Sequence, residues 1–190
     1  MKNYIKNFNP KKDILIIGNS TNVLQYELGE FIDKNFFTIR FKTVSKKDRE
    51  LGIKFKDNVL ENKKYTGSNI DMIFKKYTPF KYFENKELIK VISKRNIINE
   101  YKKKYKRKIS RGLIAILVFL QVYEYNNINK PIYIHGFSFN RNNIYNENFN
   151  DYDLKNMDMG KNCHNYNIEK EIIYDLISKD KVKFLLDIVK

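Results

Sequence analysis

The order of apolar and polar positions near the N-terminus predicts a strand, a helix and a second strand. Residues 13–18, DILIIG, form an isoleucine-rich run that ends at a glycine. Ser20 or Asn22 can cap a following helix, and the apolar positions of that helix share one face: Leu24, Leu28, Phe31 and Ile32. Residues 36–41, FFTIRF, form the next predicted strand. Such a βαβ unit favours a parallel sheet.

The remaining apolar patterns extend this α/β arrangement. LGIKFKDNVL and NIDMIFKKY each contain a strand-like core, and residues 86–108 have the pattern of a basic helix. A strongly apolar helix is predicted from Ser110 to about Tyr125, then a buried strand, PIYIHGF, over residues 131–137. After an Asn-rich loop at 140–162, NIEKEIIYDLIS predicts an amphipathic helix and VKFLLDIV a terminal strand. We therefore expect one domain over residues 1–190, with a Rossmann-like, mostly parallel sheet and flanking helices.

Composition favours a folded protein of the cytoplasm. The chain has 190 residues, of which 42% are hydrophobic and 15% aromatic, which is enough for one domain with a core. A single cysteine excludes a disulfide framework. The longest apolar run, Leu113 to Leu120, is too short to span a bilayer, and the basic N-terminus lacks the apolar segment of a signal peptide.

The net charge of +15 allows nucleic acid, an anionic membrane or a negatively charged substrate as partner. The chain is also rich in Ile, Asn, Tyr and Phe and poor in Gly and Pro, the bias that AT-rich codons produce, so part of the lysine excess reflects codon usage. A solvated or membrane-facing basic surface is favoured over nucleic-acid binding. The basic stretch 94–108 carries Tyr101 and Tyr105 on one helical face, which could contact RNA or anionic lipid.

The turn in ILIIGNSTN is a candidate anion site. In a parallel sheet, ligands bind outside the carboxyl ends of the strands, and a helix N-terminus after Gly18 would attract a phosphate. Asn19, Ser20 and Asn22 add polar side chains there. The turn lacks the later glycines of a dinucleotide fingerprint and the Gly-Lys-Ser/Thr of a P-loop, so a monophosphate nucleotide fits better. The alternative is an ordinary strand-to-helix turn with a polar cap.

Three stretches together resemble the motifs of the sialyltransferases of glycosyltransferase family 29. ILIIGNSTNVLQYELGEFIDKNFFTIRF resembles the large sialylmotif, and SRGLIAILVFLQVYEYNNINKPIYIHGFSF resembles the small one. HNYNIE, a histidine with a glutamate five residues later, resembles the very small motif. Order and spacing agree across roughly residues 14–42 and 109–175.

This resemblance implies a GT-A-like variant fold, a CMP-activated acid sugar as donor and no metal requirement. Asn19 and Ser20 would contact the cytidine nucleotide and its phosphate. Ser110 and Gly112 would lie on the side of the donor phosphate and carboxylate. The residues lining the cytidine pocket would be Gly136, Phe137 and Ser138. His164 would be the catalytic base, with Glu169 as its supporting group.

The sequence also departs from this family. Where the family has Arg-x-Asn in the second strand, this chain has Arg40-Phe-Lys42. Lys42 can still pair with a phosphate, but it cannot donate and accept hydrogen bonds as asparagine does. The chain is shorter than a typical member and lacks the usual disulfide cysteines, and we expect it to have no membrane anchor. These departures indicate a microbial, cytoplasmic relative.

General-base chemistry near neutral pH suits an imidazole, and the chain has two histidines. His164 precedes the predicted C-terminal helix, where a base could meet an incoming sugar; its alternative is a surface histidine. His135 lies in PIYIHGF, where it could reach the leaving phosphate, or it is a packed strand residue. Arg40 is a possible charged neighbour of that phosphate, or a surface charge at the end of a strand.

Metal chemistry has weaker signals. Asp151 and Asp153 form an Asp-x-Asp pair, which binds Mn²⁺ or Mg²⁺ in metal-dependent GT-A enzymes, but this pair falls in the Asn-rich loop and not directly after a core strand. Cys163 adjoins His164 without a second cysteine, so zinc is not expected.

The sequence therefore predicts an inverting, metal-independent glycosyltransferase that moves a sialic-acid-type sugar from a CMP-sugar donor to a glycan or glycolipid hydroxyl. Its product would belong to a bacterial surface glycan, and peripheral contact with an anionic membrane fits its charge. Two alternatives stay open: a transferase for Kdo or another CMP-activated sugar, and an inactive basic protein of the same fold that binds nucleotide or nucleic acid.

Overall fold

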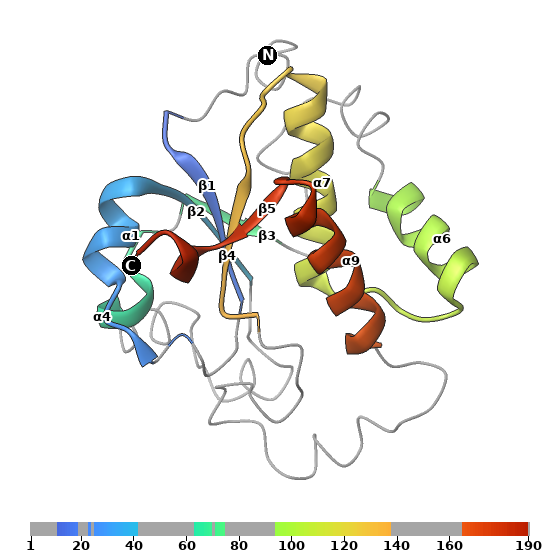
Figure 1. The fold of residues 1–190 in the computed structure, drawn as a ribbon, viewed down its shortest axis with the longest axis horizontal. Helices are drawn as coiled ribbons and strands as arrows, with labels where there is room; N and C mark the ends of the chain where they lie inside the picture. Colours follow the sequence, from blue (N-terminus) through green and yellow to red (C-terminus); the bar gives the residue numbers. More distant parts are fainter. Residues whose placement is uncertain are drawn as a thin grey trace, which may run out of the picture.

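The centre of the structure is a parallel β-sheet. The computed structural model describes residues 11–18, 23, 25–41, 63–69, 71–74, 94–137 and 165–189. Within these residues the sheet has five strands in the order β3-β2-β1-β4-β5, and every neighbouring pair is parallel. The strands are β1 (Asp13–Ile17), β2 (Phe36–Phe41), β3 (Met72–Phe74), β4 (Ile132–His135) and β5 (Val182–Phe184). The predicted α/β fold with a Rossmann-like parallel sheet is confirmed (Figure 1).

The helices cover both faces of this sheet (Figure 1). On one side lie α6 (Lys94–Tyr105), α7 (Arg111–Tyr125) and α9 (Tyr166–Ser178). On the other lie α1 (Gly29–Asn35), α4 (Lys63–Thr66) and the short 3-10 helix η3 (Leu185–Asp187). Even α7, the most apolar of these helices, has only 15 residues, and among the described helices none has both the length and the apolarity to cross a bilayer.

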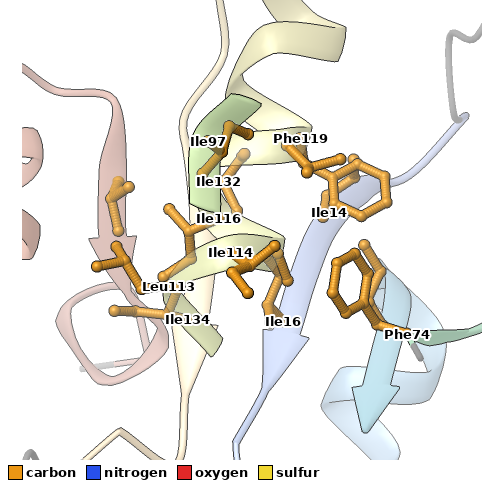
Figure 2. Packing of buried hydrophobic residues seen from close by; sticks show 14 of the residues in the cluster. Ile14, Ile16, Phe74, Ile97, Leu113, Ile114, Ile116, Phe119, Ile132 and Ile134 are labelled. Atoms are coloured by element: carbon orange, nitrogen blue, oxygen red, sulfur yellow. The ribbon is translucent and has the colours of Figure 1, made fainter. Parts of the chain in front are cut away.

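Alternate residues of β1 explain why its sequence is apolar throughout. Ile14 and Ile16 belong to the cluster that contains Leu113, Ile116 and Phe119 of α7, whereas Leu15 and Ile17 pack with Ile32 and Leu185 on the other face. Figure 2 shows the larger cluster between the sheet and α7. Because successive side chains point to opposite faces and helices cover both faces, neither face of this strand tolerates polar residues.

The first helix begins later than the sequence suggests. We expected it to follow Ser20 or Asn22, but α1 begins at Gly29, and Leu28 at its N-cap makes no side-chain capping bond. Val23 is buried, and its Cγ1 atom lies where a side chain on Gly136 would be, so the chain packs against the end of β4 before it turns into α1. Ile32 is buried as predicted, but Phe31 is exposed.

Most other elements lie where the sequence predicts them. The apolar helix, the amphipathic C-terminal helix and the strand in NIDMIFKKY are present as α7, α9 and β3. The basic helix occupies residues 94–105, and residues 86–93 lie outside the described part. The terminal strand is shorter than expected, because the chain leaves the sheet after Phe184 and forms η3. The predicted strand at 51–60 and the loop at 140–162 also lie outside the described residues.

Candidate functional site

The strand order predicts a ligand-binding crevice at the carboxyl ends of β1 and β4. The chain builds β1, β2 and β3 outward on one side and then returns to add β4 and β5 on the other side of β1. At such a reversal, the connections that leave neighbouring strands turn to opposite faces, and open α/β sheets bind ligands outside the carboxyl ends of these strands. Gly18 follows β1 and Gly136 follows β4, so two of the three predicted site glycines lie at this point. We call it the switch crevice.

The two glycines allow the backbones to pass very close to each other. The Gly18 N–H donates a hydrogen bond to the His135 carbonyl oxygen at 2.7 Å. A Cβ atom on Gly18 would lie 2.3 Å from the Gly136 carbonyl oxygen. A Cβ on Gly136 would lie 2.6 Å from Val23 Cγ1, and Gly136 has a positive φ of 75°. Backbone packing at the switch crevice is thus a sufficient reason for the glycine in ILIIGNSTN.

Phe137 connects the crevice to the start of α7. A Cβ atom on Gly112 would lie 2.6 Å from Cε1 of the Phe137 ring, and one on Gly18 would lie 3.3 Å from its Cδ2 atom. The half-buried ring therefore lies between the end of β1 and the first turn of α7. Gly112 is therefore needed to make room for the Phe137 ring.

Ser110 and Glu169 join the starts of α7 and α9. The Ser110 hydroxyl caps α7 by accepting the Leu113 N–H at 3.1 Å. The Ser110 N–H donates to Glu169 Oε1 at 2.7 Å, although the two residues are 59 positions apart. Glu169 lies in the first turn of α9, after its N-cap Asn165, and is only 3% exposed. Burial raises the pKa of Glu169 to about 7, despite the opposing hydrogen bonds of Ser110.

His135 is a buried imidazole with an unused nitrogen. It is 3% exposed, and its Nε2 atom has no hydrogen-bond partner among the described residues. Burial, and to a smaller extent the nearby Arg40 charge, lower the pKa of His135 to about 4, so the ring is neutral at physiological pH. The strand register places His135 and Arg40 on either side of Ile17 and therefore on the same face of the sheet.

Arg40 is not a surface charge at the end of a strand. It is 5% exposed, and its Nε donates to the Asn69 carbonyl at 2.9 Å. Its terminal nitrogens donate to the Thr66 hydroxyl at 3.2 Å and to the Thr66 and Gly67 carbonyls. These bonds hold residues 66–69 against the end of β2. A contact between Arg40 and a phosphate stays a prediction.

A second set of hydrogen bonds, which the sequence patterns did not predict, holds residues 68, 69 and 71 against α1 and β2. The Asp33 carboxylate accepts the N–H groups of Ser68 and Asn69, each at 2.8 Å, and the Ser68 hydroxyl at 2.7 Å. Asp71 accepts the Thr38 N–H at 2.7 Å. Aspartate, serine and asparagine commonly occur in surface turns, so nothing in the sequence marks these partners more than 30 residues apart.

The prediction that Tyr101 lies on an exposed face is wrong. We expected it on an outward face of the basic helix, but it is 5% exposed and its ring lies 4.8 Å from that of the half-buried Tyr105. Its hydroxyl has no hydrogen-bond partner among the described residues, and burial first and then the nearby Glu169 raise its pKa. Tyr101 is thus a further member of the junction between α6, α7 and α9.

Several predicted site residues lie outside the described part of the structure: Asn19, Ser20, Asn22, Lys42, Ser138 and His164, together with Cys163 and the Asp151–Asp153 pair. Gly18, Arg40, Ser110, Gly112, His135, Gly136, Phe137 and Glu169 are described. Within the described ranges, no three His, Cys, Asp or Glu side chains are grouped so that they could hold a metal ion.

Comparison with known proteins gives distant structural similarities only. No protein-family description matches the chain, and no curated protein matches it. One similar solved structure is a tyrosine-to-phenylalanine variant of the sialyltransferase CST-II in complex with CMP, with 13% identity, 92% of this chain and 81% of that chain covered, and a TM-score of 0.48. Another is the sialyltransferase CstII from Campylobacter jejuni in complex with a substrate analogue, cytidine-5'-monophosphate, with 14% identity, 93% and 81% coverage, and a TM-score of 0.46. Similarity at this level concerns the general fold and not the activity.

Proposed function

We propose that this protein is a glycosyltransferase that transfers a sialic-acid-type sugar from a CMP-sugar donor to a glycan hydroxyl, with inversion and without a metal. The observation that carries the proposal is the convergence of three separate sequence stretches. The stretch containing Gly18 meets the one containing His135 and Phe137, while Ser110 meets Glu169 of the third. These are the stretches that resemble the three sialylmotifs, and they converge where α/β sheets bind nucleotides.

In this proposal the donor phosphate lies near the N-terminus of α7. The positive end of a 15-residue helix dipole favours an anion, and it can stabilise the negative charge that develops on CMP as it leaves. His135 lies at the end of β4 on the face of the sheet opposite α7, and its contact with the leaving phosphate stays a prediction. The choice of cytidine over other bases rests on the sequence resemblance alone.

Transfer then requires one bond to form and one to break. The acceptor hydroxyl oxygen attacks the anomeric carbon from the face opposite CMP, and the bond between that carbon and the phosphate oxygen breaks, so CMP leaves with the electron pair. His164 takes the proton of the hydroxyl as general base. Glu169 anchors the first turn of α9 to Ser110, and the α9 N-cap Asn165 directly follows His164 in the sequence. We therefore assign Glu169 a positioning role.

The deciding experiment is calorimetric titration with CMP, UMP and AMP in EDTA, at moderate and at high salt. A preference for CMP that persists in all conditions is expected, because a built pocket does not depend on counterion release. Weak, base-indifferent binding that disappears with salt would refute the proposal. His164→Ala should abolish sugar transfer while leaving CMP affinity nearly unchanged, and retained transfer would remove His164 from the mechanism.

A further inference from the structure

The end of α6 and the turn after it carry a dense group of cations. Residues 102–108 read KKKYKRK, and no acidic residue occurs from Tyr101 to Gly112. The side chains of Lys102, Lys103, Lys104 and Lys106 are exposed. None of these four forms an ion pair with another described residue. We call residues 102–108 the basic edge.

The basic edge lies at the same end of the sheet as the switch crevice. It leads through the buried Ile109 directly to Ser110, which caps α7 and bonds to Glu169 at the start of α9. The contact between the first turn of α7 and Phe137 places this junction next to the carboxyl end of β4. Figure 1 shows α6 descending toward the lower end of α7, the end to which the strands point.

The inner side of α6 limits what this surface can recognise. Ile97 and Tyr101 are buried, and the Tyr105 ring packs against Tyr101, so the helix is fixed to the core by its apolar residues while lysines face outward. Proteins that bind single-stranded nucleic acid stack bases on exposed aromatic rings. The described part of α6 turns both of its tyrosines toward the core. An anionic lipid surface needs only clustered positive charge.

We propose that the basic edge docks the protein on an anionic lipid membrane, with the switch crevice facing that surface. The charge complementarity is direct, because an anionic leaflet attracts clusters of about four to eight basic residues of this kind. The acceptor hydroxyl then belongs to a glycan attached to the membrane. This last statement rests on the proposed function, whereas the docking itself does not.

The experiment is co-sedimentation with phosphatidylcholine vesicles with and without phosphatidylglycerol. The test variant is Lys102→Gln/Lys103→Gln/Lys104→Gln, which keeps good helix formers. The control variant is Lys11→Gln/Lys34→Gln/Lys181→Gln, which removes three exposed lysines, also without ion pairs among the described residues, at the opposite end of the sheet, where β1, β2 and β5 begin. Circular dichroism verifies that both variants fold.

The parent should bind only the vesicles that contain phosphatidylglycerol. The test variant should bind them about 100-fold more weakly, since each lysine near an anionic surface contributes about fivefold. The control should stay within a few-fold of the parent. Equal losses in the two variants would mean adsorption through net charge and would overturn the proposal, as would absence of lipid binding. A test variant that loses duplex RNA binding but keeps vesicle binding would assign the basic edge to nucleic acid and also overturn it.

Calorimetry without vesicles separates this proposal from the proposed function. The test variant should bind CMP like the parent, because residues 102–104 are outside the crevice. If the parent shows no preference for CMP but binds the anionic vesicles, the transferase proposal is refuted and the docking proposal stands. If the parent prefers CMP but binds no vesicles, the docking proposal is refuted and the transferase proposal stands.

Discussion

Replacing Glu169 with glutamine should change how the stability of the protein depends on pH. The folded carboxyl keeps its proton up to about pH 7, because burial raises its pKa from the ordinary value of 4.5. The unfolded chain releases this proton near pH 4.5. The stability that the protonated group contributes is therefore complete below pH 4.5 and is lost as the pH rises to about 7. The shift corresponds to about 3 kcal/mol of unfolding free energy.

His135 acts with the opposite sign over nearly the same range. Its pKa falls from 6.5 to about 4 in the folded protein, because burial and the Arg40 charge disfavour the imidazolium. The stability from the neutral ring is present above pH 6.5 and is lost as the pH falls to about 4, again by about 3 kcal/mol. The two contributions nearly cancel between pH 4.5 and 6.5 in the parent protein.

Glu169→Gln removes one of these opposing contributions and retains an amide oxygen that can accept the Ser110 N–H. Its unfolding free energy should therefore rise by about 3 kcal/mol from about pH 4 to 6.5, while that of the parent changes little. Urea unfolding at stepped pH, followed by circular dichroism, measures this difference. The control is Glu171→Gln, an exposed position on the same helix, which should follow the parent. A Glu169→Gln profile parallel to the parent's would refute the assignment of the buried titration to this carboxyl.

Three further substitutions test the contacts that shape the site. Gly18→Ala should destabilise the protein by about 1–3 kcal/mol, because the new Cβ would overlap the Gly136 carbonyl at 2.3 Å; an unchanged Tm would show that the backbones can separate freely. Arg40→Lys should cost about 2 kcal/mol in urea unfolding, since one ammonium cannot reach both the Thr66 and Asn69 carbonyls, and a loss no larger than that of a surface lysine variant would contradict this. Asp33→Ala should speed amide hydrogen exchange at residues 68 and 69 and lower the unfolding free energy by about 1 kcal/mol. Exchange rates equal to the parent's would argue against these two hydrogen bonds.

Local chemistry was enough to predict the parts of the site that depend on neighbours in the chain. The apolar run predicts a helix that begins at Ser110, and the Ser110 hydroxyl caps α7 by accepting the N–H three residues later. Gly18 and Gly136 end their strands where the apolar runs end. The single domain over residues 1–190 and the roles of Asn19, Ser20, Asn22, Lys42, Ser138 and His164 remain predictions, because these residues lie outside the described part or no observation tests them.

Periodicity and capping act over a few residues, so the sequence was sufficient to predict the parallel sheet, its flanking helices and the residues at the strand ends. Which groups meet depended on the folded arrangement of distant segments. In the folded protein α1 begins at Gly29, and Tyr101 is buried in the core. Arg40 donates hydrogen bonds to carbonyls of residues 66–69, and Glu169 accepts the N–H of Ser110. Burial also set the proton affinities of Glu169 and His135, because desolvation depends on what surrounds a side chain and not on its sequence neighbours.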